Sequence, residues 1–134
     1  MPTAAASTPG LILFAHGARD PRWSAPFEAV ALQVRTARPD AQVRLAFLEF
    51  MSPTLPQAGA ELALLGCRVV TVLPMFLGAG GHVRKDLPLL LDGLRAAHPA
   101  VRFELLPAIG EDTSVVHAMA QAAVAGMAGM GAAA

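Results

Sequence analysis

Short apolar segments alternate along the chain with longer segments of mixed polarity. Residues 11–15 read Leu-Ile-Leu-Phe-Ala, an unbroken apolar run that is typical of a strand buried on both faces. Apolar or alternating segments predict three more strands at 43–47, 69–76 and 101–105. In the stretches that follow each strand, apolar residues recur every three or four positions, as on one side of a helix. The pattern therefore predicts four successive strand–helix units.

Capping residues predict where the helices begin and end. Asp20 and Ser52 each precede a proline, and this pair of residues suits the first turn of a helix. The first helix is expected to end before Pro39, Gly66 to end the second, and Asp112 to cap the last.

This order of elements predicts an α/β fold, a doubly wound four-stranded parallel sheet with helices on both faces. Right-handed crossovers in so small a sheet favour the strand order 2-1-3-4, by analogy with flavodoxin-like folds. We expect one domain over residues 10–125, a flexible N-terminus at 1–9 and a flexible Ala/Gly tail at 126–134.

Composition excludes several classes of protein. Of the 134 residues, 54% are hydrophobic and 15% are charged, which is the composition of a folded domain. Ten basic residues balance ten acidic ones, which argues against a protein that coats nucleic acid or an anionic membrane. The single cysteine, Cys67, fits a reducing compartment, and neither a targeting segment nor a membrane span is apparent. We therefore expect a cytoplasmic protein.

Chemistry-bearing residues gather where the first three strands end. His16 directly follows the first strand, Glu49 the second, and His82 comes after the third strand and a glycine-rich run at 78–81. With the order 2-1-3-4 the winding reverses between strands one and three, and ligands of open parallel sheets bind at such a point. Two imidazoles and a carboxylate suit Co²⁺, Fe²⁺, Ni²⁺ or Zn²⁺, and so few ligands leave coordination positions open. Taken singly, each histidine is more typical of a cap or a core position, so the hypothesis depends on their convergence.

Asp86 has two compatible interpretations. It follows His82 by four residues, so it could accept a hydrogen bond from that imidazole if a helix has already begun. It could also cap a helix that begins before Pro88. The glycine-rich run does not give a nucleotide-binding motif, and we expect structural roles for His98 and His117.

Four stretches resemble the CbiX/SirB group of sirohydrochlorin chelatases: residues 15–21, 46–49, 74–88 and 107–112. The resemblance runs over roughly residues 10–125, and the passage from the glycines through His82 to Asp86-Leu-Pro is its most specific part. It implies insertion of Co²⁺ or Fe²⁺ into sirohydrochlorin without ATP, in cobalamin or sirohaem biosynthesis, by the short, single-unit form, which acts as a homodimer. It also implies that the divalent metal, Ni²⁺ included, is a substrate and that no cofactor is permanently bound.

The resemblance implies roles for individual residues. His16 and His82 would hold the incoming metal above the tetrapyrrole plane, and Glu49 matches a glutamate that assists metal binding. Either a neutral histidine or Glu49 must accept the two pyrrolic protons that the metal displaces. Six residues are candidates for binding the macrocycle and its carboxylates, the cationic ones being equally compatible with solvated loop charges: Arg19, Arg22, Arg84, Lys85, Met75 and Phe76.

Two other functions fit the same residues. One is a non-catalytic carrier of metal or tetrapyrrole, with the same two-histidine site and no turnover. The other is a metal-dependent hydrolase that activates water among His16, His82 and Glu49. The chain offers no second cluster of acidic ligands for such a hydrolase.

Overall fold

The sheet in the computed structural model has the predicted architecture. The structure describes residues 7–78 and 80–131, apart from the side chains of residues 82, 130 and 131. Its four parallel strands are β1 (Gly10–Ala15), β2 (Gln42–Phe47), β3 (Val69–Pro74) and β4 (Arg102–Leu105). They are arranged in the order β2-β1-β3-β4, which confirms the predicted order.

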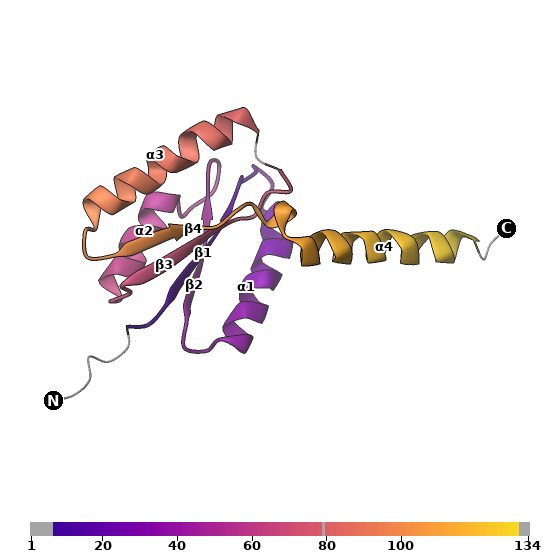
Figure 1. The fold of residues 1–134 in the computed structure, drawn as a ribbon, viewed down its shortest axis with the longest axis horizontal. Coiled ribbons are helices and arrows are strands. Elements are labelled where there is room, and N and C mark those ends of the chain that lie inside the picture. Colours follow the sequence, from indigo (N-terminus) through magenta and orange to yellow (C-terminus); the bar gives the residue numbers. More distant parts are fainter. Residues whose placement is uncertain (1–6, 79, 132–134) are drawn as a thin grey trace.

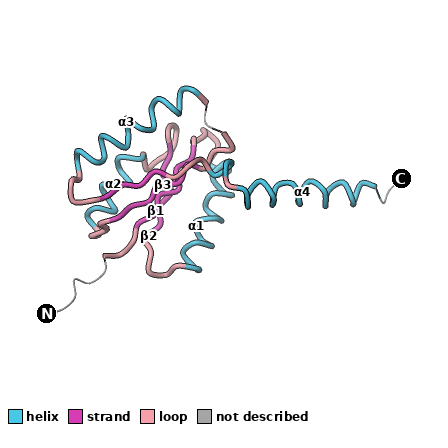
Figure 2. The backbone as a smooth tube through the Cα atoms, in the orientation of Figure 1, coloured by secondary structure: helices cyan, strands magenta, loops and turns pink. Residues whose placement is uncertain are grey.

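Helices lie on both faces of this sheet (Figures 1 and 2). The helical elements are η1 (Pro21–Ser24), α1 (Ala25–Ala37), α2 (Leu55–Leu64), α3 (Gly81–Ala97), η2 (Ile109–Glu111) and α4 (Thr113–Gly131). The helices α2 and α3 pack against each other and cover one face, whereas α1 packs on β2 and β1 from the other side. Among the described residues, no helix combines the length and the hydrophobicity of a membrane span.

The central strand β1 explains why residues 11–15 are apolar without interruption. Ile12 and Phe14 belong to the main core under α2 and α3, whereas Leu13 belongs to a smaller core under α1. All three side chains are almost completely buried, because both faces of a central parallel strand are covered.

The second helix begins later than the sequence predicted. Its cap is Thr54, whose side chain accepts the N–H of Gln57 at 3.3 Å while the Gln57 side chain accepts the N–H of Thr54 at 2.9 Å. The prediction that Ser52 caps this helix is wrong. A reciprocal capping box needs Gln or Glu three residues after the cap, and the residue three after Ser52 is Leu55.

The other helix ends follow the sequence in part. Asp20 does accept the N–H of Arg22 at 2.9 Å, but the turn that it caps is the 3₁₀ helix η1, with α1 following. Helix α3 already begins at Gly81, so the interpretation of Asp86 as its cap is wrong. The predicted stop at Gly66 is confirmed, because this glycine has a φ of 87° and directly follows the C-cap of α2.

Helix α4 extends away from the sheet instead of covering it (Figure 1). Asp112 caps it as predicted: its carboxylate accepts the N–H of Ser114 at 2.9 Å, and hydrogen bonds from Ser114 lower the pKa of Asp112. The helix continues to Gly131, past residue 125, where the sequence suggested that the domain ends.

Candidate functional site

His16 and Glu49 meet at the carboxyl edge of the sheet. The Nε2 atom of His16 lies 3.0 Å from the Oε1 atom of Glu49, and the two side chains are 49% and 48% exposed. The imidazole and the carboxylate are therefore paired, yet both remain accessible to an ion from solution. This contact brings together two of the three ligands that the sequence predicted.

Backbone hydrogen bonds between the two loops fix this pair. Beyond the ends of β1 and β2, the N–H of Leu48 donates to the carbonyl of Ala15 at 3.0 Å, and the N–H of Glu49 donates to that of His16 at 3.1 Å. Gly17 makes the approach possible. Its φ is 95°, and a Cβ atom at this position would lie 1.9 Å from the carbonyl oxygen of Glu49. The loops can be this close only if residue 17 is glycine.

The separation of the two ligand atoms suits a metal ion. Two ligands at about 2.1 Å from an ion, at a right angle to each other, are roughly 3.0 Å apart. This is the distance between His16 Nε2 and Glu49 Oε1. An ion that binds both atoms would therefore take the place of the hydrogen bond between them.

Phe76 connects this pair to a cavity. Its ring meets that of His16 edge to face, with 6.4 Å between centroids, and meets Phe14 in the same way at 5.9 Å. Phe76 also lines an open cavity of about 470 Å³ beside the first turns of α3 and the end of β4, with Val83 and Arg84. This volume lies in the range of small-molecule pockets. The apolar side of the candidate site is thus formed by Phe76.

One residue in the loop after β2, Phe50, was not predicted from the sequence. Phe50 follows Glu49, has a φ of 67°, which is rare for a residue with a side chain, and is 56% exposed. The guanidinium of Arg19 lies 4.8 Å from the centroid of its ring, so a predicted substrate-binding cation rests on an aromatic side chain. The sequence reasoning missed Phe50. The available signal was an aromatic residue next to the only acidic residue of an apolar segment.

The third predicted ligand, His82, is in the first turn of α3, which follows the carboxyl end of β3. Its side chain lies outside the described part of the structure. Asp86 is on the same helix four residues later and is half-buried. Within the described side chains, no group of three or more histidine, cysteine or acidic residues is placed to hold a metal ion.

The other residues that the sequence predicted for binding the macrocycle do not all lie at the candidate site. Arg22 pairs with Asp20 at 2.9 Å, and this hydrogen-bonded pair lowers the pKa of Asp20. Lys85 is exposed on α3, whereas Met75 packs against the smaller core on the α1 side and thus on the face opposite Phe76. Successive residues of an extended segment point to opposite faces, which explains why neighbours 75 and 76 separate.

Two further residues lie away from this edge. The His98 ring follows α3 and lies 6.3 Å from that of Phe103, and Cys67 is buried before β3, where burial raises the pKa of its thiol. The ring contact fits the structural role predicted for His98, and Cys67 occupies the position of a small buried apolar side chain.

The sequence comparison settles the family. The model of the CbiX family matches residues 10–125. The chain belongs to the CbiX family. Relatives of this CbiX chain include the sirohydrochlorin cobaltochelatases of Methanothermobacter thermautotrophicus, 32% identical over 82 residues, and Methanocaldococcus jannaschii, 32% identical over 88 residues. The aligned segments cover 61% and 66% of this chain and 57% and 62% of those proteins, so the chain spans less than two thirds of their length.

Solved structures agree with this assignment. A CbiX protein of Marinobacter aquaeolei, described as a cobalamin biosynthesis protein, superposes with a TM-score of 0.79 at 30% identity, covering 89% of this chain and 97% of that one. The sirohydrochlorin chelatase SirB of Bacillus subtilis, in complex with cobalt, gives a TM-score of 0.67 at 25% identity. It is matched over 83% of this chain but only 47% of its own, so the CbiX chain corresponds to about half of SirB.

Proposed function

We propose that this CbiX protein is a sirohydrochlorin chelatase, which inserts Co²⁺ or Fe²⁺ into the macrocycle without ATP. The observation that carries the proposal is the accessible pair of His16 and Glu49, 3.0 Å apart at the carboxyl edge of the sheet. Membership of a family whose relatives are named sirohydrochlorin cobaltochelatases supplies the substrate.

The metal is a substrate that passes through the site. We assign its binding to His16, His82 and Glu49, since His16 follows β1 and His82 is in the first turn of α3, which follows β3. When the ion enters the macrocycle, two pyrrolic N–H protons leave, so that charge is conserved. Each proton is accepted by one base, either the Glu49 carboxylate, freed from its hydrogen bond with His16, or a neutral imidazole, and then passes to solvent.

The macrocycle is assigned to the surface between this pair and the cavity beside α3. Phe76 is half-buried between the two and offers an apolar contact. Arg84 lines the cavity, Lys85 is exposed on the same helix, and Arg19 lies over the ring of Phe50, which follows Glu49. These cations can pair with the carboxylates of sirohydrochlorin. The ion pair with Asp20 makes Arg22 the weakest of the predicted contacts.

A homodimer completes this proposal. One copy corresponds to about half of SirB, and a single sheet edge offers a cavity that is open on one side. A second copy would supply the other wall for a flat macrocycle. We also place the protein in the cytoplasm, because its single cysteine is a buried free thiol.

The test is an anaerobic optical assay of the full chain with sirohydrochlorin and Co²⁺, repeated with Fe²⁺ and Ni²⁺. We expect the absorption spectrum to change to that of the metallated macrocycle faster than without protein, over many turnovers per chain. An uncatalysed rate would contradict the proposal. Stoichiometric binding of metal or tetrapyrrole without acceleration would identify a carrier instead.

A further inference from the structure

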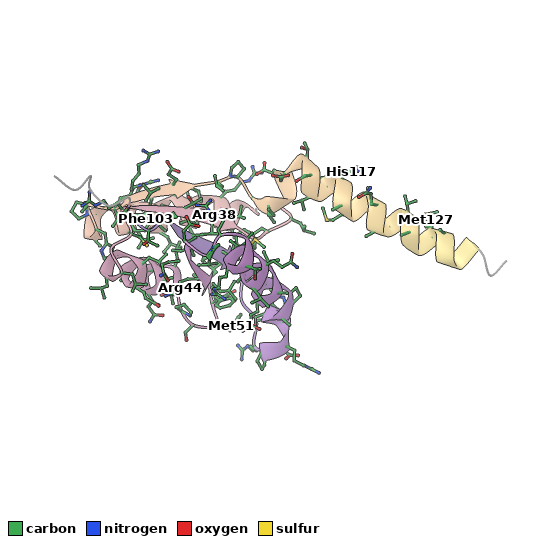
Figure 3. All side chains as sticks on the ribbon, turned by 90° about the horizontal axis from the view of Figure 1, so that it is seen from below. Arg38, Arg44, Met51, Phe103, His117 and Met127 are labelled. Carbon is green, nitrogen blue, oxygen red and sulfur yellow. The ribbon has the colours of Figure 1, made fainter. Side chains whose placement is uncertain are left out.

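Helix α4 is apolar and exposed at the same time. Residues 113–131 contain no Asp, Glu, Lys or Arg. Val116, Met119, Val124 and Met127 are 49%, 42%, 66% and 73% exposed. Figure 3 shows His117 and Met127 on a helix that stands clear of the domain, and α4 packs mainly against the short η2. A helix with apolar residues and no charge on any side normally lies buried.

The β3–β4 half of the sheet face on the α1 side is also apolar in part and exposed. On the side where α1 covers β2 and β1, the strands β3 and β4 extend beyond the helix. The surface there includes Val69 and Leu106, which are 37% and 40% exposed, and the half-buried Thr71 and Leu73. Parallel sheets are covered on both faces, so this half-face also lacks its usual helix.

Helix α4 begins next to the exposed β3–β4 half-face but does not pack on it. A hollow of about 210 Å³, lined by Leu73, Leu106 and Ile109, lies where this half-face ends and where α4 begins. The segment η2 is fixed there, since the N–H of Gly110 donates to the carbonyl of Phe76 at 3.0 Å. From this point α4 runs outward, away from the uncovered strands (Figure 1).

We propose that two copies of the chain exchange α4, so that the helix of each covers the β3–β4 half-face of the other, beside its α1. The same chain carries both the helix without a sheet and the half-face without a helix, and this makes a second copy the fitting partner. A reciprocal exchange closes with two-fold symmetry and leaves neither feature exposed. The inference rests on the homodimer in the proposed function and specifies its interface.

The area of the exchanged contacts reaches the lower end of what a specific dimer buries. A helix of this length is about 28 Å long and 10 Å wide, so one side of it covers roughly 280 Å² and hides a similar area of sheet. Two such contacts bury about 1,100 Å², at the lower limit for a specific interface. The apolar side chains of α4 would meet Val69, Leu73 and Leu106, with Thr71 and the ion pair between Arg102 and Glu104 beside them.

The register of the exchange can be stated. If Val116, in the first turn of α4, lies beside Leu106 and the helix runs back along the strands, the eight residues from Val116 to Val124 advance about 12 Å. The four residues from Leu106 back to Arg102, which pairs with Val69, span about 13 Å of strand. Val124 of one copy should therefore lie beside Val69 of the other.

Disulfide cross-linking of full-length chains tests this register. A tagged Val69→Cys chain and an untagged Val124→Cys chain are refolded together and mildly oxidised. We expect a disulfide between the two different chains, because their residues 69 and 124 become neighbours. As a control, Leu64→Cys, which is 89% exposed on α2, should give no cross-link with Val124→Cys. The unmodified chain should give none either, since its Cys67 is buried.

Three results would overturn the exchange. The first is that no cross-link forms between the two chains. The second is a cross-link between two copies of Val124→Cys, which would mean that α4 pairs with α4. The third is a purely intramolecular disulfide in the Val69→Cys, Val124→Cys double variant. If these occur while the unmodified dimer inserts cobalt, only the exchange is wrong. If the expected cross-link forms in a chain that inserts no metal, only the chelatase proposal is wrong.

Discussion

Gly17 determines how closely His16 and Glu49 can approach each other. We expect Gly17→Ala to lower the free energy of unfolding by about 1–3 kcal/mol, because the new Cβ atom would meet the Glu49 carbonyl and the residue would keep a positive φ. The loops must separate to relieve this contact, so Co²⁺ affinity should fall by about tenfold or more. Chemical denaturation and titration with Co²⁺ measure the two effects.

Gly93→Ala is the matched control for this substitution. Gly93 lies within α3, and a Cβ atom there would meet nothing within 4 Å. This variant should gain about 0.5–1 kcal/mol of stability and keep the Co²⁺ affinity of the unmodified chain. Unchanged metal affinity in Gly17→Ala would contradict the role given to the close approach of the two loops.

The sequence located these residues because topology alone decides which edge they share. Residues that directly follow parallel strands must lie at the same end of the sheet, so His16 and Glu49 could be paired before any coordinates. The side on which a loop residue points is decided by local backbone geometry. For this reason Met75 was expected beside Phe76 but packs on the opposite face, and Phe50 was overlooked.

The start of α2 distinguishes two capping signals that look alike in the sequence. Thr54→Ala should lower the free energy of unfolding by about 1 kcal/mol, because it removes the acceptor for the Gln57 N–H from the capping box. Ser52→Ala, two residues earlier in an exposed position, should change stability by less than about 0.5 kcal/mol. Thermal denaturation of both variants compares these losses of stability. A larger loss of stability in Ser52→Ala would contradict Thr54 as the cap and favour Ser52, the residue that the sequence suggested.

The order of elements was more predictable than their ends. The apolar run of β1 and the alternation of strands with helices are sufficient for the order β2-β1-β3-β4, because crossover handedness leaves few alternatives. Helix ends depend on single hydrogen bonds. The early start of α3 at Gly81, with Pro88 inside the helix, illustrates this, since a proline usually marks the first turn.

In the whole molecule, the placement of α4 was the least predictable feature. Its capping residue, Asp112, was correctly identified from the sequence. The Ala/Gly composition of residues 126–134 was instead interpreted as a flexible tail. The pattern of apolar residues indicates that a helix needs an apolar surface to pack on. It does not indicate whether that surface belongs to the same chain. The exposed half-face of β3 and β4 becomes visible only when the sheet is assembled.

The central claim is that His16 and His82 act on one metal ion. The initial rate of Co²⁺ insertion into sirohydrochlorin under anaerobic conditions tests it most directly, in His16→Ala, His82→Ala and, as a control, His98→Ala, whose ring lies near Phe103. We predict that each of the first two variants loses about 100-fold or more of the rate, while His98→Ala keeps it. Full activity in both His16→Ala and His82→Ala would contradict the account.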